Sequence, residues 1–281
     1  MIKNKSIFAA ALMAFAMIAS PSMAQTHATP EIQKQPWSFA GIFGTYDEAQ
    51  LQRGFQVFRE VCSSCHSARL LAFRNLSEHG GPGYTEAQVK ALAAEYKIAD
   101  ASVEGGQRPG VAADHWPSPF ATEQEARDAN GGALPPDMSV LAKARGTTQP
   151  FPWWILNYFT AYSEGGPDYI HALLNGYEET PPEGAEVPEG KYYNHYFPGN
   201  AIGMAPPLQD GLVTYEAGEG GTAVPMTVDQ YSRDVAAFLM WVAEPHLVDR
   251  KETGFKVIIF LFLFAGLMWL VKQRLWSKVE H

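Results

Sequence analysis

One short motif constrains this chain more than any other feature. Cys62 and Cys65 are separated by two residues, and His66 follows directly, which is the spacing of a c-type haem attachment site. On a helix these three positions share a face, so two sulfurs can bond the haem vinyl groups while the imidazole ligates the iron. A C-x-x-C pair also occurs in redox dithiols and zinc sites. These are the only 2 cysteines in the chain, so no second pair completes a zinc site.

The beginning of the chain has the pattern of an export signal. Lys3 and Lys5 precede an apolar run from Ile7 to Ala19, and small residues follow up to Ala24. This pattern predicts a signal peptide over residues 1–24. Its removal takes the formal charge from −9 to −11 because two lysines are lost. Such acidity argues against nucleic acid as a partner and favours a basic one.

The other end of the chain is apolar over a longer stretch. Residues 255–271 carry one charge, Lys256, and their number is at the short limit of the roughly 17–25 residues that span a bilayer. A buried core helix is the alternative. Positive charges follow the run at Lys272, Arg274 and Lys278, and such charges mark the cytoplasmic side of a membrane. We therefore expect an inner-membrane protein with a periplasmic haem domain (25–252), one transmembrane anchor (253–273) and a cytoplasmic tail (274–281).

Between these ends the pattern predicts a mainly helical, class I-like c-type cytochrome domain with long irregular loops. Asp47 is the expected N-cap of a helix whose apolar face, formed by Leu51, Phe55 and Phe58, continues into the haem motif. A partner helix is expected from about Val228 to Ala243, with a capping box of Thr227 and Gln230. Gly54 would allow the two helices to cross closely. Shorter helices are expected over 85–96, with a capping box of Thr85 and Gln88, and over 137–145 and 167–175.

The second axial ligand of the iron decides what such a haem can do. Methionine closes the site for electron transfer, whereas an open site admits peroxide chemistry. Met204 is the best candidate because Gly203 lets the backbone approach a ring closely and Pro206 and Pro207 stiffen the loop. Met138, Met226 and His195 remain as competitors.

The mature chain from Trp37 onward resembles the cytochrome c1 family, the haem subunits of ubiquinol–cytochrome c oxidoreductase, in its bacterial form. The matching segments occur in the family's order along nearly all of the mature chain. They are 37–44, 54–66, 132–137, 165–177, 196–208 and the C-terminal apolar segment. The stretch between Arg145 and Gly165 is longer here than in mitochondrial members.

This resemblance implies one covalently bound haem c and a set of residues around it. Cys62 and Cys65 would form the thioethers, and His66 and Met204 would be the axial ligands. Arg145 would lie near a haem propionate with Tyr169 beside it. The pocket would be lined by Asn130, Ala133 and Pro136.

The resulting hypothesis is an electron carrier with no catalytic residue of its own. It would take single electrons from a Rieske iron–sulfur subunit and pass them to a soluble or membrane-bound c-type cytochrome. Its other partners would be cytochrome b and the membrane, in a complex that we expect to be dimeric. The alternative is a membrane-bound c-haem peroxidase, or the haem subunit of another dehydrogenase.

Overall fold

The structure is a computed structural model that describes residues 31–145, 152, 155–157, 164–216 and 223–277. The predicted signal peptide (1–24) and most of residues 150–162, a segment rich in aromatic residues, lie outside these residues. The described part is mainly helical, as expected, with two small antiparallel sheets of two strands each.

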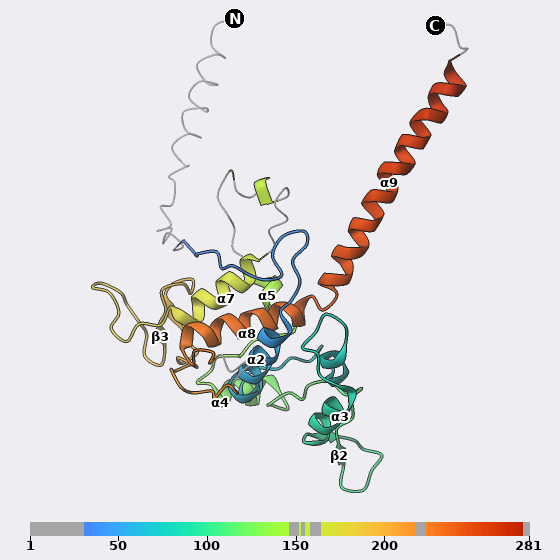
Figure 1. Ribbon diagram of the computed structural model, residues 1–281. Coiled ribbons are helices and arrows are strands. Elements are labelled where there is room, and N and C mark those ends of the chain that lie inside the picture. Colours follow the sequence, from blue (N-terminus) through green and yellow to red (C-terminus); the bar gives the residue numbers. More distant parts are fainter. Residues whose placement is uncertain (1–30, 146–151, 153–154, 158–163, 217–222, 278–281) are drawn as a thin grey trace, which may run out of the picture. The chain divides into compact units, whose positions relative to one another are not determined.

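The helices and strands are joined by long loops (Figure 1). Their bounds are α2 (Glu48–Glu60), η1 (Cys62–Ser64), η2 (Phe73–Ser77), α3 (Glu86–Ala94), β1 (Lys97–Ala99), β2 (Gln107–Pro109), α4 (Glu123–Ala129), α5 (Leu141–Ala144), α7 (Gly165–Asn175), β3 (Tyr192–Tyr193), β4 (Ala201–Ile202), α8 (Val228–Ala243) and α9 (Leu247–Trp276).

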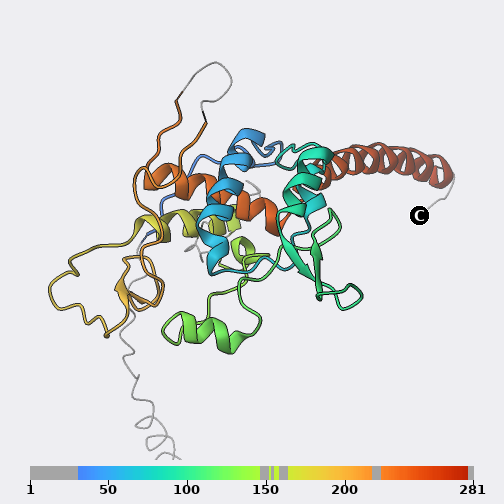
Figure 2. The ribbon, with the colours of Figure 1, turned by 90° about the horizontal axis from the view of Figure 1, so that it is seen from below.

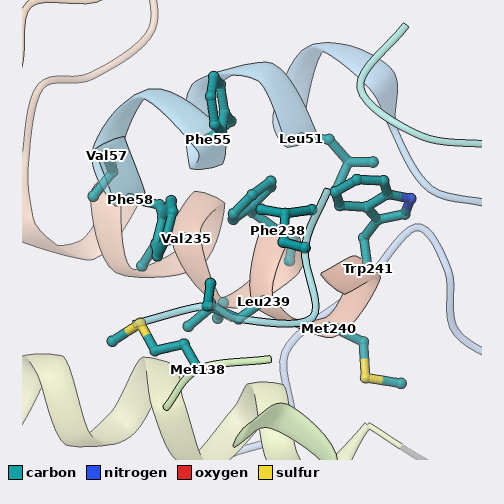
Figure 3. Close-up of a cluster of buried hydrophobic side chains, with 14 of the residues drawn as sticks. Leu51, Phe55, Val57, Phe58, Met138, Val235, Phe238, Leu239, Met240 and Trp241 are labelled. Carbon is teal, nitrogen blue, oxygen red and sulfur yellow. The ribbon is translucent and has the colours of Figure 1, made fainter. Parts of the chain in front are cut away.

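The core of the protein is the crossing of α2 over α8, which Figure 2 shows from below. Gly54 makes this crossing possible, since a Cβ atom there would lie 2.1 Å from the carbonyl oxygen of Asp234 and 2.7 Å from Cβ of Phe238. Phe55, Phe58 and Phe238 meet around this point with ring centroids 5.5–5.6 Å apart (Figure 3). The prediction of two closely crossing helices is therefore confirmed.

A buried carboxylate joins the same two helices. Asp234 is fully buried on α8, and its oxygens accept hydrogen bonds from Arg53 Nε at 2.9 Å, Gln230 Nε2 at 2.9 Å and Gln50 Nε2 at 3.2 Å. A buried charge is costly unless it is paired and hydrogen-bonded, and here both conditions are met. The polar contacts thus fix the rotation of α2 against α8, while the apolar contacts supply most of the burial.

Local signals in the sequence placed most helix ends correctly. Asp47 Oδ1 accepts a hydrogen bond from Gln50 N at 2.7 Å, and Thr85 and Gln88 form the expected capping box of α3. At α8, Thr227 Oγ1 accepts from Gln230 N. The reciprocal half of that predicted box is wrong, because the Gln230 amide donates to Asp234 instead.

Two other predictions need correction. The helix expected over 137–145 is only α5, because Asp137 and Ser139 bind the segment after the haem motif instead of starting a helix. The α2 helix does not carry the whole motif either. It ends at Glu60, Val61 is its C-cap, and Cys62 begins a 3-10 turn.

The last helix, α9, contains the apolar run and is longer than the predicted anchor. Its first turn packs on the haem domain through Leu247 and Val248, which are 1% and 7% exposed. Within the described residues it is the one helix long and apolar enough to span a membrane, and none of its most apolar 18 residues is buried. Glu244, between α8 and α9, pairs with Lys143 at 3.0 Å and with Arg250. The start of α9 is therefore fixed to the domain.

Candidate haem site

The haem motif folds as a tight turn at the end of α2. Cys65 N and His66 N both donate to the carbonyl oxygen of Cys62, at 3.2 and 2.9 Å. The bond from His66 is an i to i+4 bond, so one α-type turn persists although the regular helix has ended. Both cysteines are half-buried and form no disulfide with each other. The turn thus keeps both thiols and the imidazole within a single turn of backbone.

His66 is oriented by one hydrogen bond. Its ring is buried, and Nδ1 lies 2.8 Å from the carbonyl oxygen of Pro136. A carbonyl can only accept, so Nδ1 carries the proton and Nε2 of the neutral ring keeps a free lone pair. Burial lowers the pKa of His66, and the bond to Pro136 only partly opposes this. The imidazole is therefore neutral and has its second nitrogen available for a metal, as histidine ligands usually do.

Pro136 belongs to a segment that is tied to the motif by an aspartate. We call residues 133–139 the strap. Asp137 Oδ2 accepts from Ser67 Oγ at 2.8 Å and Arg69 N at 3.0 Å, and Oδ1 accepts from Ser139 N at 2.9 Å. Burial alone would raise the pKa of Asp137, but these hydrogen bonds outweigh it and hold the pKa below its usual range. The carboxylate thus stays ionised and keeps the strap against His66.

Met204 lies in an irregular segment after β4. The β3 and β4 strands pair with Tyr192 opposite Ile202 and Tyr193 opposite Ala201. Asn194 is fully buried behind them: its Nδ2 donates to Leu173 O on α7 at 2.7 Å, and its Oδ1 accepts from the backbone N–H groups of Tyr196 and Phe197. One side chain therefore joins the methionine segment to α7.

The strap contacts both predicted ligand segments. Pro136 binds His66, and three residues earlier the Cβ of Ala133 lies 3.1 Å from where a Cβ on Gly203 would be. Three residues of extended chain span at most about 10 Å. The segments that carry His66 and Met204 therefore both contact the strap, at positions three residues apart. Glycine at position 203 permits this approach to Ala133, whereas its predicted role beside a haem ring stays a prediction.

Tyr177 contacts the backbone of Met204 and interacts with a second tyrosine, Tyr169. Tyr177 Oη donates to the carbonyl oxygen of Met204 at 3.1 Å. Burial raises the pKa of Tyr177, and the neighbouring Tyr169 raises it further. Burial also raises the pKa of Tyr169, and the positive charge of Arg145 partly offsets that effect. Arg145, Tyr169 and Tyr177 are therefore close together, with the Arg145 side chain exposed at the end of α5.

The remaining predicted residues have clear local environments. Asn130 is the C-cap of α4: its Nδ2 donates to Ala126 O at 2.7 Å, and its carbonyl accepts from Ala133 N at 3.1 Å. It shapes the turn into the strap. Of the competing ligands, Met138 is 7% exposed within the hydrophobic core, beside Leu239 in Figure 3. Met226 is 41% exposed, and the exposed His195 packs edge-on against Tyr196.

Comparison with known proteins shows the family to which this chain belongs. A model described as the Cytochrome C1 family matches residues 37–279. The chain belongs to the cytochrome c1 family. It is 50% identical to cytochrome c1 of Blastochloris viridis over 92% of this chain and 91% of that protein. It is 45% identical to cytochrome c1 of Rhodospirillum rubrum over 89% of each chain.

A third relative in the cytochrome c1 family is much longer than this chain. Cytochrome b/c1 of Bradyrhizobium diazoefficiens is 52% identical over 96% of this chain, which spans only 39% of that protein's length. Mitochondrial relatives from Solanum tuberosum are named heme proteins. The cofactor of the family is a covalently bound haem c.

The residues around the motif fit a covalent haem c. The two thiols and the imidazole come from one turn, and the imidazole presents its free nitrogen. Among the described residues no group of three histidine, cysteine or carboxylate side chains is arranged to hold a metal ion on its own. In a haem c, the porphyrin and a second axial group would supply the other ligands of an iron bound to His66.

Two residues that position the cytochrome c1 site were not identified from the sequence. In the sequence, Asp137 ends a segment that matches the family and begins an expected helix, and Asn194 has no predicted role. Both act on partners at a distance along the chain, 70 residues for Asp137 with Ser67 and 21 for Asn194 with Leu173. The only sequence signal is a short polar side chain directly after Pro-Pro or between two aromatic residues, which is weak evidence.

Proposed function

We propose that this chain relays single electrons within a cytochrome bc1 complex, from a Rieske iron–sulfur subunit to a c-type cytochrome outside the complex. Membership of the cytochrome c1 family supports the electron-transfer role. A relative whose name joins cytochrome b and c1 supports cytochrome b as a neighbouring subunit, as does the Candida albicans relative named as a subunit of the cytochrome b-c1 complex. We also propose that the complex is dimeric.

One observation carries this proposal: the strap reaches both predicted ligand segments. His66 Nε2 and Met204 Sδ would be the axial ligands, and Cys62 and Cys65 would form the thioethers. When bound, the haem supplies one-electron redox chemistry at its iron. The protein's part is to hold both ligands in place, so that neither site opens to peroxide or another small molecule. Quinol oxidation would belong to the partner subunits.

The residues around the ligands would set the reduction potential. Pro136 fixes the tautomer and the rotation of His66. Tyr177 holds the backbone of Met204. Arg145, near Tyr169, would place a positive charge beside a haem propionate, and Asn130 and Ala133 would shape the pocket wall. None of these roles moves a proton or breaks a bond, which suits a carrier and not an enzyme.

The membrane arrangement is the second part of the proposal. The relatives and the apolar helix support a membrane-anchored protein. We propose that the haem domain is periplasmic, that α9 crosses the inner membrane and that the C-terminus is cytoplasmic. Truncation after Glu252 would keep the buried Leu247 and Val248. The truncated protein should be a soluble haem protein in the periplasm, and its retention in membranes after a high-salt wash would contradict the anchor.

Purification from native membranes tests the function itself. The full-length protein, carrying an affinity tag, should purify with a cytochrome b and a Rieske protein. In this particle its haem should be reduced by quinol and reoxidised by an added soluble c-type cytochrome. A particle without those subunits, or a reduced haem that binds carbon monoxide, would contradict the proposal. In the second case an axial site would be open.

A further inference from the structure

A short turn before α2 exposes large apolar side chains without an evident reason. Residues 40–45, which we call the 40–45 turn, contain Ile42 and Phe43, and these are 52% and 75% exposed. No charged residue occurs between Trp37 and Tyr46. Isolated exposed apolar residues are common on proteins, so exposure alone would mean little. The conformation and location of this turn distinguish its two apolar side chains from such isolated residues.

The backbone of the 40–45 turn has a defined conformation. Gly41 has a left-handed φ of 71°, and a Cβ on Gly44 would lie 2.1 Å from the Ala40 carbonyl oxygen, so both positions require glycine. Thr45 N donates to Ser38 O at 3.1 Å. Behind the turn, Trp37 and Phe39 are buried and stacked 5.4 Å apart. The exposed side chains of Ile42 and Phe43 are therefore presented by a backbone of defined conformation.

A lysine of α9 holds this turn. Lys251 Nζ donates to the carbonyl oxygens of Phe39 at 2.6 Å and Gly44 at 3.2 Å. Two carbonyl groups that would otherwise need water are satisfied in this way. Carbonyls paired in this way cost less to remove from water than unpaired ones, provided that the Lys251 ammonium itself stays on the headgroup side of the turn. The same contact sets the distance of the turn from the apolar run.

The turn lies at the level where the apolar run of α9 begins. Phe43 and Phe255 meet edge to face with ring centroids 5.5 Å apart, and Phe255 is the first residue of the run. Between the turn and the helix is a cavity of about 300 Å³, lined on one side by residues 42–45 and on the other by Val248, Lys251, Glu252, Phe255 and Lys256. Lys256 pairs with Glu252 at 3.7 Å. The cavity thus has apolar walls and a charged edge.

We propose that the 40–45 turn is a second membrane contact of this protein. Ile42 and Phe43 enter the boundary between headgroups and acyl chains in the leaflet where α9 begins to cross. A phospholipid acyl chain fills the cavity, and the Lys256 ammonium faces the lipid phosphate. The proposal rests on α9 being the membrane anchor. A lipid is favoured over a protein partner because the exposed Phe43 ring contacts Phe255 at the start of the apolar run, and because apolar and phenylalanine side chains of interfacial segments enter this boundary.

The proposed membrane contact affects the orientation of the haem domain. A single helix leaves the attached domain free to tilt against the bilayer, whereas a second contact beside the helix limits the tilt and fixes which side of the domain faces the membrane. The haem domain would then present one fixed side to the partners that deliver and accept electrons. The turn would act as a positioning element and would not touch the cofactor.

Photochemical crosslinking in native membranes tests this proposal. Phe43 is replaced by p-benzoylphenylalanine in the full-length, haem-loaded protein, which is irradiated and then analysed by mass spectrometry. Position 111 is the matched control, because Val111 is apolar and 50% exposed in the loop that follows β2. Position 263, in the middle of the apolar run, reports on the anchor. We expect phospholipid adducts at positions 43 and 263, several-fold more abundant than at position 111.

Three results would overturn the proposal. A protein adduct at position 43 would show that another subunit covers the turn. A yield no higher than at position 111, with lipid adducts at position 263, would place the turn in water. The absence of lipid adducts at position 263 would remove the anchor and the proposal with it. The haem spectrum checks that each variant is folded, and position 42 replaces position 43 if that variant loses its haem.

Discussion

His66 follows α2, one of the two helices whose crossing forms the core. Met204 instead follows β4, a strand of two residues in a region of loops. On the histidine side, α2 and α8 bury aromatic rings against each other over several turns. On the methionine side, the backbone is positioned by individual hydrogen bonds from Asn194 and Tyr177. The histidine side therefore depends on buried area and the methionine side on a few polar contacts. Substitutions on the first should lower stability, and substitutions on the second should change the haem's electronic properties.

Met204→Leu should have the largest effect, because it removes the predicted ligand on the methionine side and leaves the histidine side unchanged. The haem should stay attached, because the thioethers hold it, while the reduction potential falls by hundreds of millivolts. Axial ligand identity moves haem potentials over a range of about 0.8 V. Redox titration and the long-wavelength sulfur–iron absorption band report the change. Met226→Leu, an exposed methionine, is the control and should leave both unchanged. An unaltered potential in Met204→Leu would mean that another residue is the ligand.

Gly54→Ala should affect stability with little effect on the potential. The new methyl group would lie 2.1 Å from a backbone oxygen of α8, so the helices must move apart. Overpacking of this kind costs typically 1–3 kcal/mol, and a backbone clash belongs at the upper end, about 3 kcal/mol. Thermal unfolding of the detergent-solubilised protein measures the loss. Gly254→Ala, a helical glycine with nothing within 4 Å of the added Cβ, should be neutral or slightly stabilising.

Asp137→Asn weakens the attachment of the strap, which contacts both the histidine side and the methionine side. Replacing the ionised acceptor should cost about 2 kcal/mol of stability near neutral pH, because hydrogen bonds to a charged group contribute more than neutral ones. The folded pKa of Asp137 lies below its usual value. Its contribution is therefore fully present above the unfolded pKa of about 3.9 and is lost as pH falls through the folded pKa. Unfolding followed against pH should show the wild-type advantage disappearing in acid. The exposed Asp128→Asn is the control, and an equal loss there would contradict a specific role.

Arg145→Gln should have the smallest effect. Removing a positive charge near the haem stabilises the oxidised state, which carries one more positive charge, so the potential should fall. At about 10 Å and an effective dielectric constant of about 20, the interaction is roughly 1.7 kcal/mol before screening, or some tens of millivolts. Lys90→Gln on α3 is the control. A potential equal to that of the control would place Arg145 away from the propionates.

The sequence was most informative where interactions are local. The N-caps of α2, α3 and α8, and the bounds of α8, follow from side chains three or four residues apart. The family resemblance supplied Met204, which spacing alone left among several candidates. The contacts of the strap could not be predicted from local patterns, because Asp137 and Pro136 bind residues 70 positions earlier. The same long-range contacts explain why the helix expected over 137–145 was too long.

The strap also bears on how quickly an electron can enter and leave. A change of one unit of charge at the iron alters the lengths that its axial bonds prefer. Ligands on floppy segments would follow that preference, and each transfer would have to wait for the surrounding atoms to rearrange. Here both predicted ligand segments contact the strap, His66 through its hydrogen bond to Pro136 and Gly203 through its close approach to Ala133. The oxidised and reduced states should therefore share nearly one geometry, and the reorganisation energy of electron transfer should be small.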